Sequence, residues 1–309
     1  MRWRGSRALG VLLCGALATL DVAAGLATLL PQTAARTLNL QARAWRPGEV
    51  LRVEWEADAP ATAGPQPAEV RAFGRAVPAY RVDTHWQALV GIDLDQSPGD
   101  YEVVAVAGTG QTIGTGRVTL EPARFTTRVL KVDPDFVNPP AAVIPRIQRE
   151  AQLMQEVFEA SAAARYWTGP FIRPVPHRAN SRFGQRSVFN GEPRNSHTGT
   201  DFLSPAGTPV RAPQAGRVVI ARDLYFSGGT VVIDHGLGAF SLLAHLSRVG
   251  TTEGAAVAAG DVVGLVGATG RVTGAHLHWG LRLGGARVDP LALVEVLAAP
   301  RATSPPALP

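Results

Sequence analysis

The sequence predicts a mainly β protein with one connecting helix, and three patterns support this prediction. Residues 38–120 contain short alternating or apolar runs separated by turn-forming clusters, which is typical of strands. Residues 146–165 change to the spacing of an amphipathic helix. Residues 262–277 hold short apolar runs punctuated by glycines, as expected for strands joined by tight turns. The 309 residues are enough for two domains and a leader.

The N-terminus, residues 1–24, is predicted to be a signal peptide. Three arginines within the first seven residues precede an apolar stretch, and small-residue patterns ending at Ala18 and Ala24 are both suitable for cleavage. The apolar character resumes after Asp21, so an uncleaved membrane anchor is the alternative. A charge within a span is costly, which favours cleavage. Contact with a membrane is therefore expected only through this leader, if it is uncleaved.

Residues 38–124 are predicted to form an accessory β-sandwich. Strand-like runs occur at 51–55, 88–92 and 101–106, and clusters rich in glycine and proline separate them. This pattern favours an immunoglobulin-like sandwich without the cysteine pair of antibody domains, because Cys14 is the only cysteine in the chain. No catalytic cluster lies there. We expect a spacer or a module that positions a substrate or partner.

A connecting helix is predicted within residues 139–167. Two consecutive prolines end the preceding strand, and apolar residues recur near helical spacing from 146 to 165. This helix can pack on the following domain or serve as a hinge. The tail, residues 298–309, contains several prolines and is predicted to be disordered.

The composition limits the classes of partner. The chain is 46% hydrophobic and 18% charged, with a formal net charge of +5, so a packed core is feasible. The arginines are scattered, and no basic run interleaved with aromatics occurs, so nucleic-acid binding is not expected. Arg271 is interpreted as an exposed charge without an assigned role. The sequence does not indicate an oligomeric state.

Four of the seven histidines lie in three short segments, and these segments suggest a metal site. The segments are His197-Thr-Gly-Thr-Asp201, Ala-His245-Leu-Ser and Gly-Ala-His276-Leu-His278-Trp. Two imidazoles and a carboxylate are a common shell for a catalytic zinc. On a strand, His276 and His278 point to the same face. His197 and Asp201 would be roughly 13 Å apart on a straight strand, so we expect a bend at Gly199 that folds them together.

Five blocks in this order give the chain a resemblance to a known family. They are His-x-Gly-x-Asp (197–201), Gly-Thr-Pro-Val (207–210), Asp-His-Gly (234–236), Ala-His-Leu-Ser (244–247) and Thr-Gly-x-His-Leu-His (273–278). Over residues 168–293 the sequence resembles the lysostaphin-type zinc endopeptidases, or LytM domain. The resemblance implies a β-rich catalytic domain at 168–297 that cleaves peptide bonds in peptidoglycan.

The resemblance also implies roles for individual residues. His197, Asp201 and His278 correspond to the ligands of one zinc ion per chain. His245 and His276 correspond to two catalytic histidines that do not bind the metal, and which of them is the base stays open. No His-Glu-x-x-His segment exists, so the glutamate base of that other zinc-protease class is absent.

Other residues near these blocks are given structural interpretations. His235 follows an apolar run and is expected to be structural. Trp279 should face away from the metal by strand alternation and lie in the core. His85 and His177 lie outside the blocks and have no assigned role.

Two functions of different classes follow from these observations. The first is an exported zinc metallo-endopeptidase of the periplasm or cell envelope that acts on peptidoglycan stem or crosslink peptides. Its scissile bond could be a D-alanyl crosslink to a diamino acid, which we favour, or an interpeptide glycine bridge. The alternative is a non-catalytic LytM-like regulator that binds and activates another cell-wall hydrolase. Such regulators usually lack ligands, whereas this chain has every expected one, and zinc content separates the two.

Overall fold

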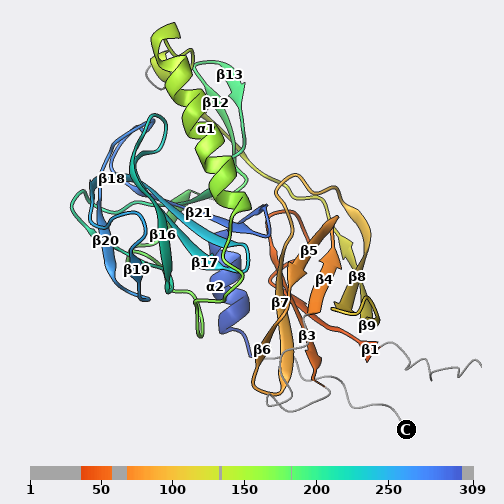
Figure 1. Ribbon diagram of the computed structural model, residues 1–309. Helices are drawn as coiled ribbons and strands as arrows, with labels where there is room; N and C mark the ends of the chain where they lie inside the picture. The colour runs from red at the N-terminus through yellow and green to blue at the C-terminus, as the bar shows by residue number, and fades with distance from the viewer. Residues whose placement is uncertain (1–35, 58–67, 132–133, 182, 301–309) are drawn as a thin grey trace, which may run out of the picture. The chain divides into compact units, whose positions relative to one another are not determined.

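The computed structural model describes residues 36–57, 68–131, 134–181 and 183–300 (Figure 1). The predicted leader, 1–24, lies outside these residues, and of the predicted disordered tail only 298–300 are included. Within the described ranges, no helix is both long enough and apolar enough to span a bilayer.

The N-terminal part forms two β-sheets that share one core, called here the β-sandwich. One sheet has the order β1-β9-β8-β4-β5, with β1 (Arg36–Thr37), β4 (Ala68–Ala72), β5 (Arg75–Pro78), β8 (Gly99–Ala107) and β9 (Thr112–Leu120). The other has the order β2-β3-β7-β6, with β2 (Asn39–Ala42), β3 (Val50–Glu56), β6 (Tyr80–Val82) and β7 (His85–Gly91). Leu51 and Val90 of one sheet meet Val70 and Val103 of the other in a common apolar cluster. The runs predicted at 51–55, 88–92 and 101–106 lie in β3, β7 and β8, except for Ile92, which follows β7.

The segment after the β-sandwich becomes a strand of a small separate sheet. Strand β10 (Thr127–Leu130) pairs in parallel with β12 (Arg186–Phe189), which pairs antiparallel with β13 (Glu192–Arg194). The register places Arg128 beside Ser187. Sequence analysis did not predict β10, because four residues give too short an alternation and the partner strand lies far along the chain.

The predicted connecting helix is present but ends earlier than expected. Short 3₁₀ turns at Pro134–Phe136 and Ala141–Val143 precede α1 (Ile144–Glu159), whereas the prediction extended to residue 165. Ser161 donates from its hydroxyl to the Asp234 carboxylate, and the backbone N–H of Ala162 donates to the same group, at 2.7 and 2.8 Å. These bonds hold the chain outside helical geometry. Phe158 packs edge-on against Phe240, so α1 packs on the following domain.

The C-terminal domain is built on one large sheet. Its main order is β11-β14-β21-β18-β17-β16-β19, with β15 and β20 paired to each other, β20 also on β18, and β22 on β21. The bounds are β11 (Ala179–Ser181), β14 (Gly199–Phe202), β15 (Pro209–Arg211), β16 (Gly216–Leu224), β17 (Gly228–Gly236), β18 (Ala239–Val249), β19 (Ala256–Val257), β20 (Val262–Val266), β21 (Leu277–Leu283) and β22 (Ala286–Val288). A final helix, α2 (Pro290–Ala298), was not predicted, although Asp289 at its N-cap and Pro290 at its first turn are a helix-start pattern.

A polar cluster joins the β-sandwich to the C-terminal domain. Arg43 pairs with Glu49 at 2.9 Å and with Asp289 at 2.7 Å. Asp289 also accepts a hydrogen bond from the Thr200 hydroxyl at 3.0 Å, so the cluster reaches β14. Nearby, Arg287 pairs with Asp93 at 2.6 Å. Charged hydrogen bonds therefore hold the two domains in contact. Thr200, the neighbour of Asp201 in β14, belongs to this cluster.

Candidate active site

The pairing of β14 with β21 sets the centre of the site. In this antiparallel register Asp201 lies opposite His278, and Gly199 lies opposite Gly280. Strand β18 lies on the other side of β21. Three neighbouring strands thus bring residues from distant parts of the chain to one place. Because register fixes which side chains share a face, the sheet itself positions Asp201 and His278.

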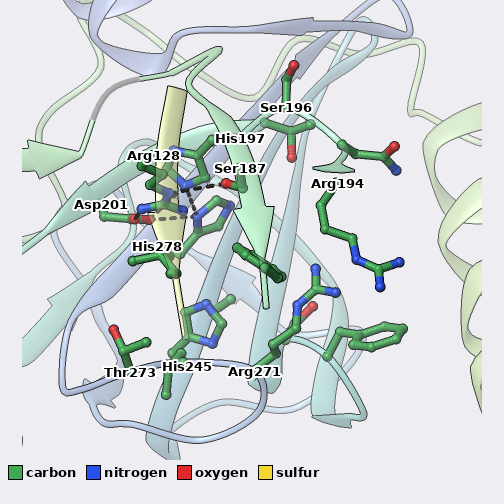
Figure 2. A pocket seen from close by; sticks show the side chains of 18 of the residues that line it. Arg128, Ser187, Arg194, Ser196, His197, Asp201, His245, Arg271, Thr273 and His278 are labelled. Atoms are coloured by element: carbon green, nitrogen blue, oxygen red, sulfur yellow. Dashed lines mark hydrogen bonds and ion pairs between the residues drawn. The ribbon is translucent and has the colours of Figure 1, made fainter. Parts of the chain in front are cut away.

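His197 reaches the same point from outside the strand. Its backbone N–H donates to the Gln185 carbonyl at 2.9 Å, and its carbonyl accepts from the Gly184 N–H at 2.8 Å. Its Nε2 lies 2.9 Å from Asp201 Oδ1 and 3.0 Å from His278 Nδ1 (Figure 2). The chain therefore bends between His197 and Asp201. A bend in this segment was predicted from the sequence.

Besides the predicted bend, the close approach of the His278 ring requires glycine at position 199. A Cβ at this position would lie 2.6 Å from both the His278 ring and the Trp279 carbonyl oxygen. Real Cβ atoms do not approach so closely, so a side chain here would displace the His278 ring. The sequence suggested only a bend at Gly199, whereas the structure shows that this residue also makes room for a neighbouring imidazole.

The donor atoms of His197, Asp201 and His278 suit a single divalent ion. All of them lie within 4.8 Å of one another. His278 Nδ1 is 2.9 Å from Asp201 Oδ1. One carboxylate oxygen and two imidazole nitrogens converge on one point, and a cation there would satisfy all three lone pairs. This nitrogen and oxygen set is one that zinc accepts. The assignment of these residues as ligands stays a prediction.

Electrostatics favour a charged carboxylate at Asp201 and an uncharged imidazole at His278. Burial raises the pKa of Asp201, but hydrogen bonds from His197 and His278 outweigh it and hold that pKa well below its ordinary value. Burial also lowers the pKa of His278. A charged carboxylate and a neutral imidazole therefore coexist at neutral pH, as metal ligands must.

His245 and His276 flank the three candidate ligands without joining their contact. Their ring centroids lie 4.9 Å apart. His245 Nδ1 donates to the Thr269 carbonyl at 2.9 Å, and His276 Nδ1 donates to the Gly274 carbonyl at 2.8 Å. A carbonyl can only accept, so the proton of each neutral ring is on Nδ1 and each Nε2 retains its lone pair. His276 Nε2 lies 3.9 Å from Asp201 Oδ1.

His245 is held in an unusual environment. Its φ is 66°, in the left-handed region that non-glycine residues rarely occupy. Its backbone N–H donates to the Ser227 carbonyl at 2.8 Å. Burial, helped by the neighbouring histidines, lowers its pKa to about 3. The ring is therefore neutral at neutral pH. Backbone strain of this kind is common where a side chain must be aimed.

The five residues line a cleft of about 540 Å³. Its lining also includes three arginines, Arg128, Arg194 and Arg271. Arg128 of β10 places Nη1 3.8 Å from Asp201 Oδ2. Arg271 was expected to be an exposed charge, and this is wrong, because its side chain is half-buried between two aromatic rings. Sequence reasoning missed Arg128 and Arg194, since neither lies in a recognisable motif.

The remaining histidines and Trp279 do not line the cleft. His235 is fully buried, and its Nδ1 and Nε2 contact the Ala215 carbonyl and the Ser241 hydroxyl at 2.8 and 2.9 Å. Its structural role is confirmed, and it is not in the cleft. Trp279 is 0% exposed and lies in the core, as predicted. His177 contacts Ser204 at 2.9 Å and does not line the cleft.

Comparisons with known proteins agree with this site. A family model described as "Peptidase family M23" matches residues 195–290. The chain is 40% identical over 123 residues to a "DD-carboxypeptidase/endopeptidase Mpg" of Neisseria meningitidis, covering 40% of this chain and 28% of that protein. It is 41% identical over 113 residues to a "Peptidoglycan DD-endopeptidase ShyA" of Vibrio cholerae, covering 36% and 26%. The matched part thus spans little more than a quarter of these curated relatives.

A solved structure extends the similarity beyond the cleft. A Pseudomonas aeruginosa crystal structure assigned to peptidase M23 shares 31% sequence identity with this chain, at a TM-score of 0.63. The alignment covers 82% of this chain and 95% of that one. Such coverage is far larger than residues 195–290 alone, so part of the N-terminal half is shared as well.

Proposed function

This chain belongs to peptidase family M23, and on that premise we propose that it is an exported, zinc-dependent endopeptidase that hydrolyses peptide crosslinks in peptidoglycan. The observation that supports the proposal most directly is the convergence of His197, Asp201 and His278 within 4.8 Å, beside two further histidines. The curated relatives named as peptidoglycan DD-endopeptidases support the substrate class.

In this proposal, the side chains of His197, Asp201 and His278 would hold the metal at the cleft. His197 would bind through Nε2, His278 through Nδ1, and Asp201 through Oδ1, which are the atoms that face one another. Bound zinc supplies Lewis acidity and lowers the pKa of a coordinated water from ~15.7 toward ~7. The backbone bonds of His197 and the sheet register of Asp201 and His278 hold these atoms in place before the metal arrives.

The two remaining histidines would handle protons. Each has its Nδ1 proton committed to a backbone carbonyl, so each Nε2 is free to accept or return a proton in the cleft. One would take a proton from the attacking water, and the other would stabilise the developing oxyanion or protonate the leaving amine. The two rings are placed alike with respect to Nδ1 and Nε2, so either His245 or His276 could be the base.

The remainder of the proposal concerns location and the β-sandwich. We place the chain in the periplasm or cell envelope, since that is where its substrate lies and the N-terminal leader suits export. We interpret the β-sandwich as immunoglobulin-like and as a spacer or positioning module. The charged contact around Arg43 and Asp289 supports a fixed placement of it against the catalytic domain.

The test is digestion of purified peptidoglycan by the purified, zinc-loaded chain, followed by mass spectrometry of the released muropeptides. We expect monomeric products from crosslinked dimers, with loss of activity on chelation. His245→Ala should retain zinc and lose turnover, and Arg217→Gln, an exposed substitution on β16, is the matched control. Near-stoichiometric zinc without any cleavage would contradict the enzyme, and absence of zinc would favour a regulator.

A further inference from the structure

The charges that line the cleft are unbalanced. Among the described residues, three arginines and a single carboxylate, that of Asp201, line the cleft, and no lysine or glutamate does. Asp201 is already engaged by His197 and His278, and a bound divalent ion would make the cleft still more positive. A concave site with such an excess attracts anionic ligands.

Arg271 carries the clearest unmatched charge. Its guanidinium carbon lies 4.6 Å from the ring centroid of Phe226 and 5.3 Å from that of Phe189. Its backbone N–H donates to the Phe226 carbonyl at 2.8 Å, which fixes the start of the side chain. Across the described ranges, its side chain has no hydrogen bond and no acidic partner. The group is nevertheless half-buried in the cleft wall.

Arg194 adds a second positive charge beside it. Burial, together with the charge of Arg194, lowers the pKa of Arg271. Figure 2 shows the two side chains pointing toward one another. Arg194 forms an ion pair with Glu192 at 2.5 Å and donates to the Val137 carbonyl at 3.0 Å, which orients it. Its buried Nε has no hydrogen-bond partner among the described residues. Two guanidinium groups that approach each other repel unless an anion lies between them.

Stacking alone does not account for this arrangement. A cation over an aromatic face is attracted to it, but the rings offer no conventional acceptor to the five N–H donors of a guanidinium. The rings of Phe189 and Phe226 hold the plane of the Arg271 guanidinium. They leave the N–H groups at its edge available to a ligand. A planar, fixed guanidinium is suited to paired hydrogen bonds with a carboxylate.

We propose that Arg271, assisted by Arg194, binds a carboxylate of the peptide substrate and so selects anionic crosslinks. This inference rests on the proposed function and makes it more specific. A D-alanyl crosslink to a diamino acid that carries a second carboxylate has that free carboxylate beside the scissile amide, and the acceptor peptide has another at its C-terminus. A glycine bridge has no charge within the bridge. The sequence left two scissile bonds open. Of these, the arginine pair favours the D-alanyl crosslink to a diamino acid over the glycine bridge.

The test uses a synthetic crosslinked peptide dimer and two analogues, one amidated beside the scissile bond and one amidated at the acceptor C-terminus. For the zinc-loaded chain we expect amidation of the recognised carboxylate to raise KM about tenfold, because charged hydrogen bonds are lost. Arg271→Gln should raise KM for the parent dimer by a similar factor with kcat little changed, and it should not distinguish acid from amide. The analogue that loses affinity identifies which carboxylate is bound.

Binding measurements separate this proposal from the proposed function. Calorimetry with zinc-loaded His245→Ala protein measures affinity for the three dimers without turnover, and the double variant with Arg271→Gln should lose the preference for the acid. Arg271→Lys should restore part of it, and Arg217→Gln should retain all of it. Equal affinity for acid and both amides would overturn the carboxylate site even if the chain cleaves all three. A preference that depends on Arg271, without any cleavage, would support the site and contradict the peptidase.

A structural role for Arg271 predicts a different result. If the residue only packs between Phe189 and Phe226, Arg271→Gln lowers the melting temperature and leaves the ratio of acid to amide affinity unchanged. That result would also overturn the proposal.

Discussion

The cleft and the contact between the β-sandwich and the C-terminal domain use charged residues in opposite ways. At the contact, Arg43 pairs with Glu49 and Asp289, and Arg287 pairs with Asp93. In the cleft, Arg271 has no acidic partner among the described residues. Both arginines of the contact are paired within the protein. Of the three arginines in the cleft, Arg128 and Arg194 approach carboxylates, and Arg271 is left available among the described residues.

This difference separates the parts of the molecule that stabilise it from those that act. Pairing satisfies buried charges and ties the two domains together, while an unmatched charge costs free energy that only a ligand can offset. Substitutions at the contact should therefore reduce stability and spare the site. Substitutions in the cleft should do the reverse.

The largest effect is expected in the cleft, from His278→Ala. Removal of one of the three proposed metal ligands should abolish zinc retention and reduce turnover by a factor on the order of 10³ or more, since in the proposed function the metal supplies the activated nucleophile. The free energy of unfolding of the metal-free protein should change little. Metal analysis, turnover and urea unfolding measure the three quantities. Full zinc content with normal turnover would show that the ligand assignment is wrong.

Arg43→Ala should produce the opposite outcome at the contact. It removes the Arg43 cation from Asp289 and from Glu49, which is 2% exposed and keeps only the pair with the exposed Arg46 at 3.2 Å. Breaking a buried ion pair typically costs 3–5 kcal/mol, so we expect a loss of about 3 kcal/mol in the free energy of unfolding, with zinc content unchanged. Arg117→Ala, on an exposed position of β9, is the control. A loss below ~0.5 kcal/mol would mean that the contact contributes little.

A pH series at Asp93 sharpens the comparison. Burial raises the pKa of Asp93, but hydrogen bonds from Arg287 outweigh it and bring the pKa to about 2, from 3.8. A depressed pKa stabilises the fold above the unfolded value and loses that effect as pH falls through the folded value. Asp93→Asn should therefore cost roughly 2 kcal/mol at neutral pH, with the difference shrinking between about pH 4 and pH 2. A difference that is independent of pH would rule out the ion pair as its source.

The smallest effect is expected for Gly199→Ala. The new Cβ would press on the His278 ring, and disturbed ligand orientation typically weakens metal binding by 10–100-fold. We expect about a tenfold higher dissociation constant for zinc. Gly280→Ala is a matched control on the paired strand, because its Cβ would meet only ordinary contacts at 3.6 Å. Equal zinc affinities of the two variants would remove the steric argument for Gly199.

Local patterns in the sequence were sufficient for several features. The alternating runs of β3, β7 and β8, the position of Trp279 in the core and the existence of α1 follow from periodicity, which is a property of neighbouring residues. The five candidate site residues were named because the sequence contains their motif blocks in the order that resembles a known family of zinc endopeptidases. The structural role of His235 was likewise inferred from its place after an apolar run, although the structure places it in β17 and fully buried.

Other features depended on contacts between residues far apart in the sequence. The end of α1 is set by the Asp234 carboxylate, some 70 residues on, and β10 exists because β12 supplies its partner. Sequence alone named the residues of the candidate metal site. Only the tertiary structure showed that Gly199 makes room for His278, and that Arg271 lies in the cleft beside Arg194 without an acidic partner among the described residues. Which distant strands pair, and which side chains meet across them, depends on long-range packing that the local pattern of one strand does not specify.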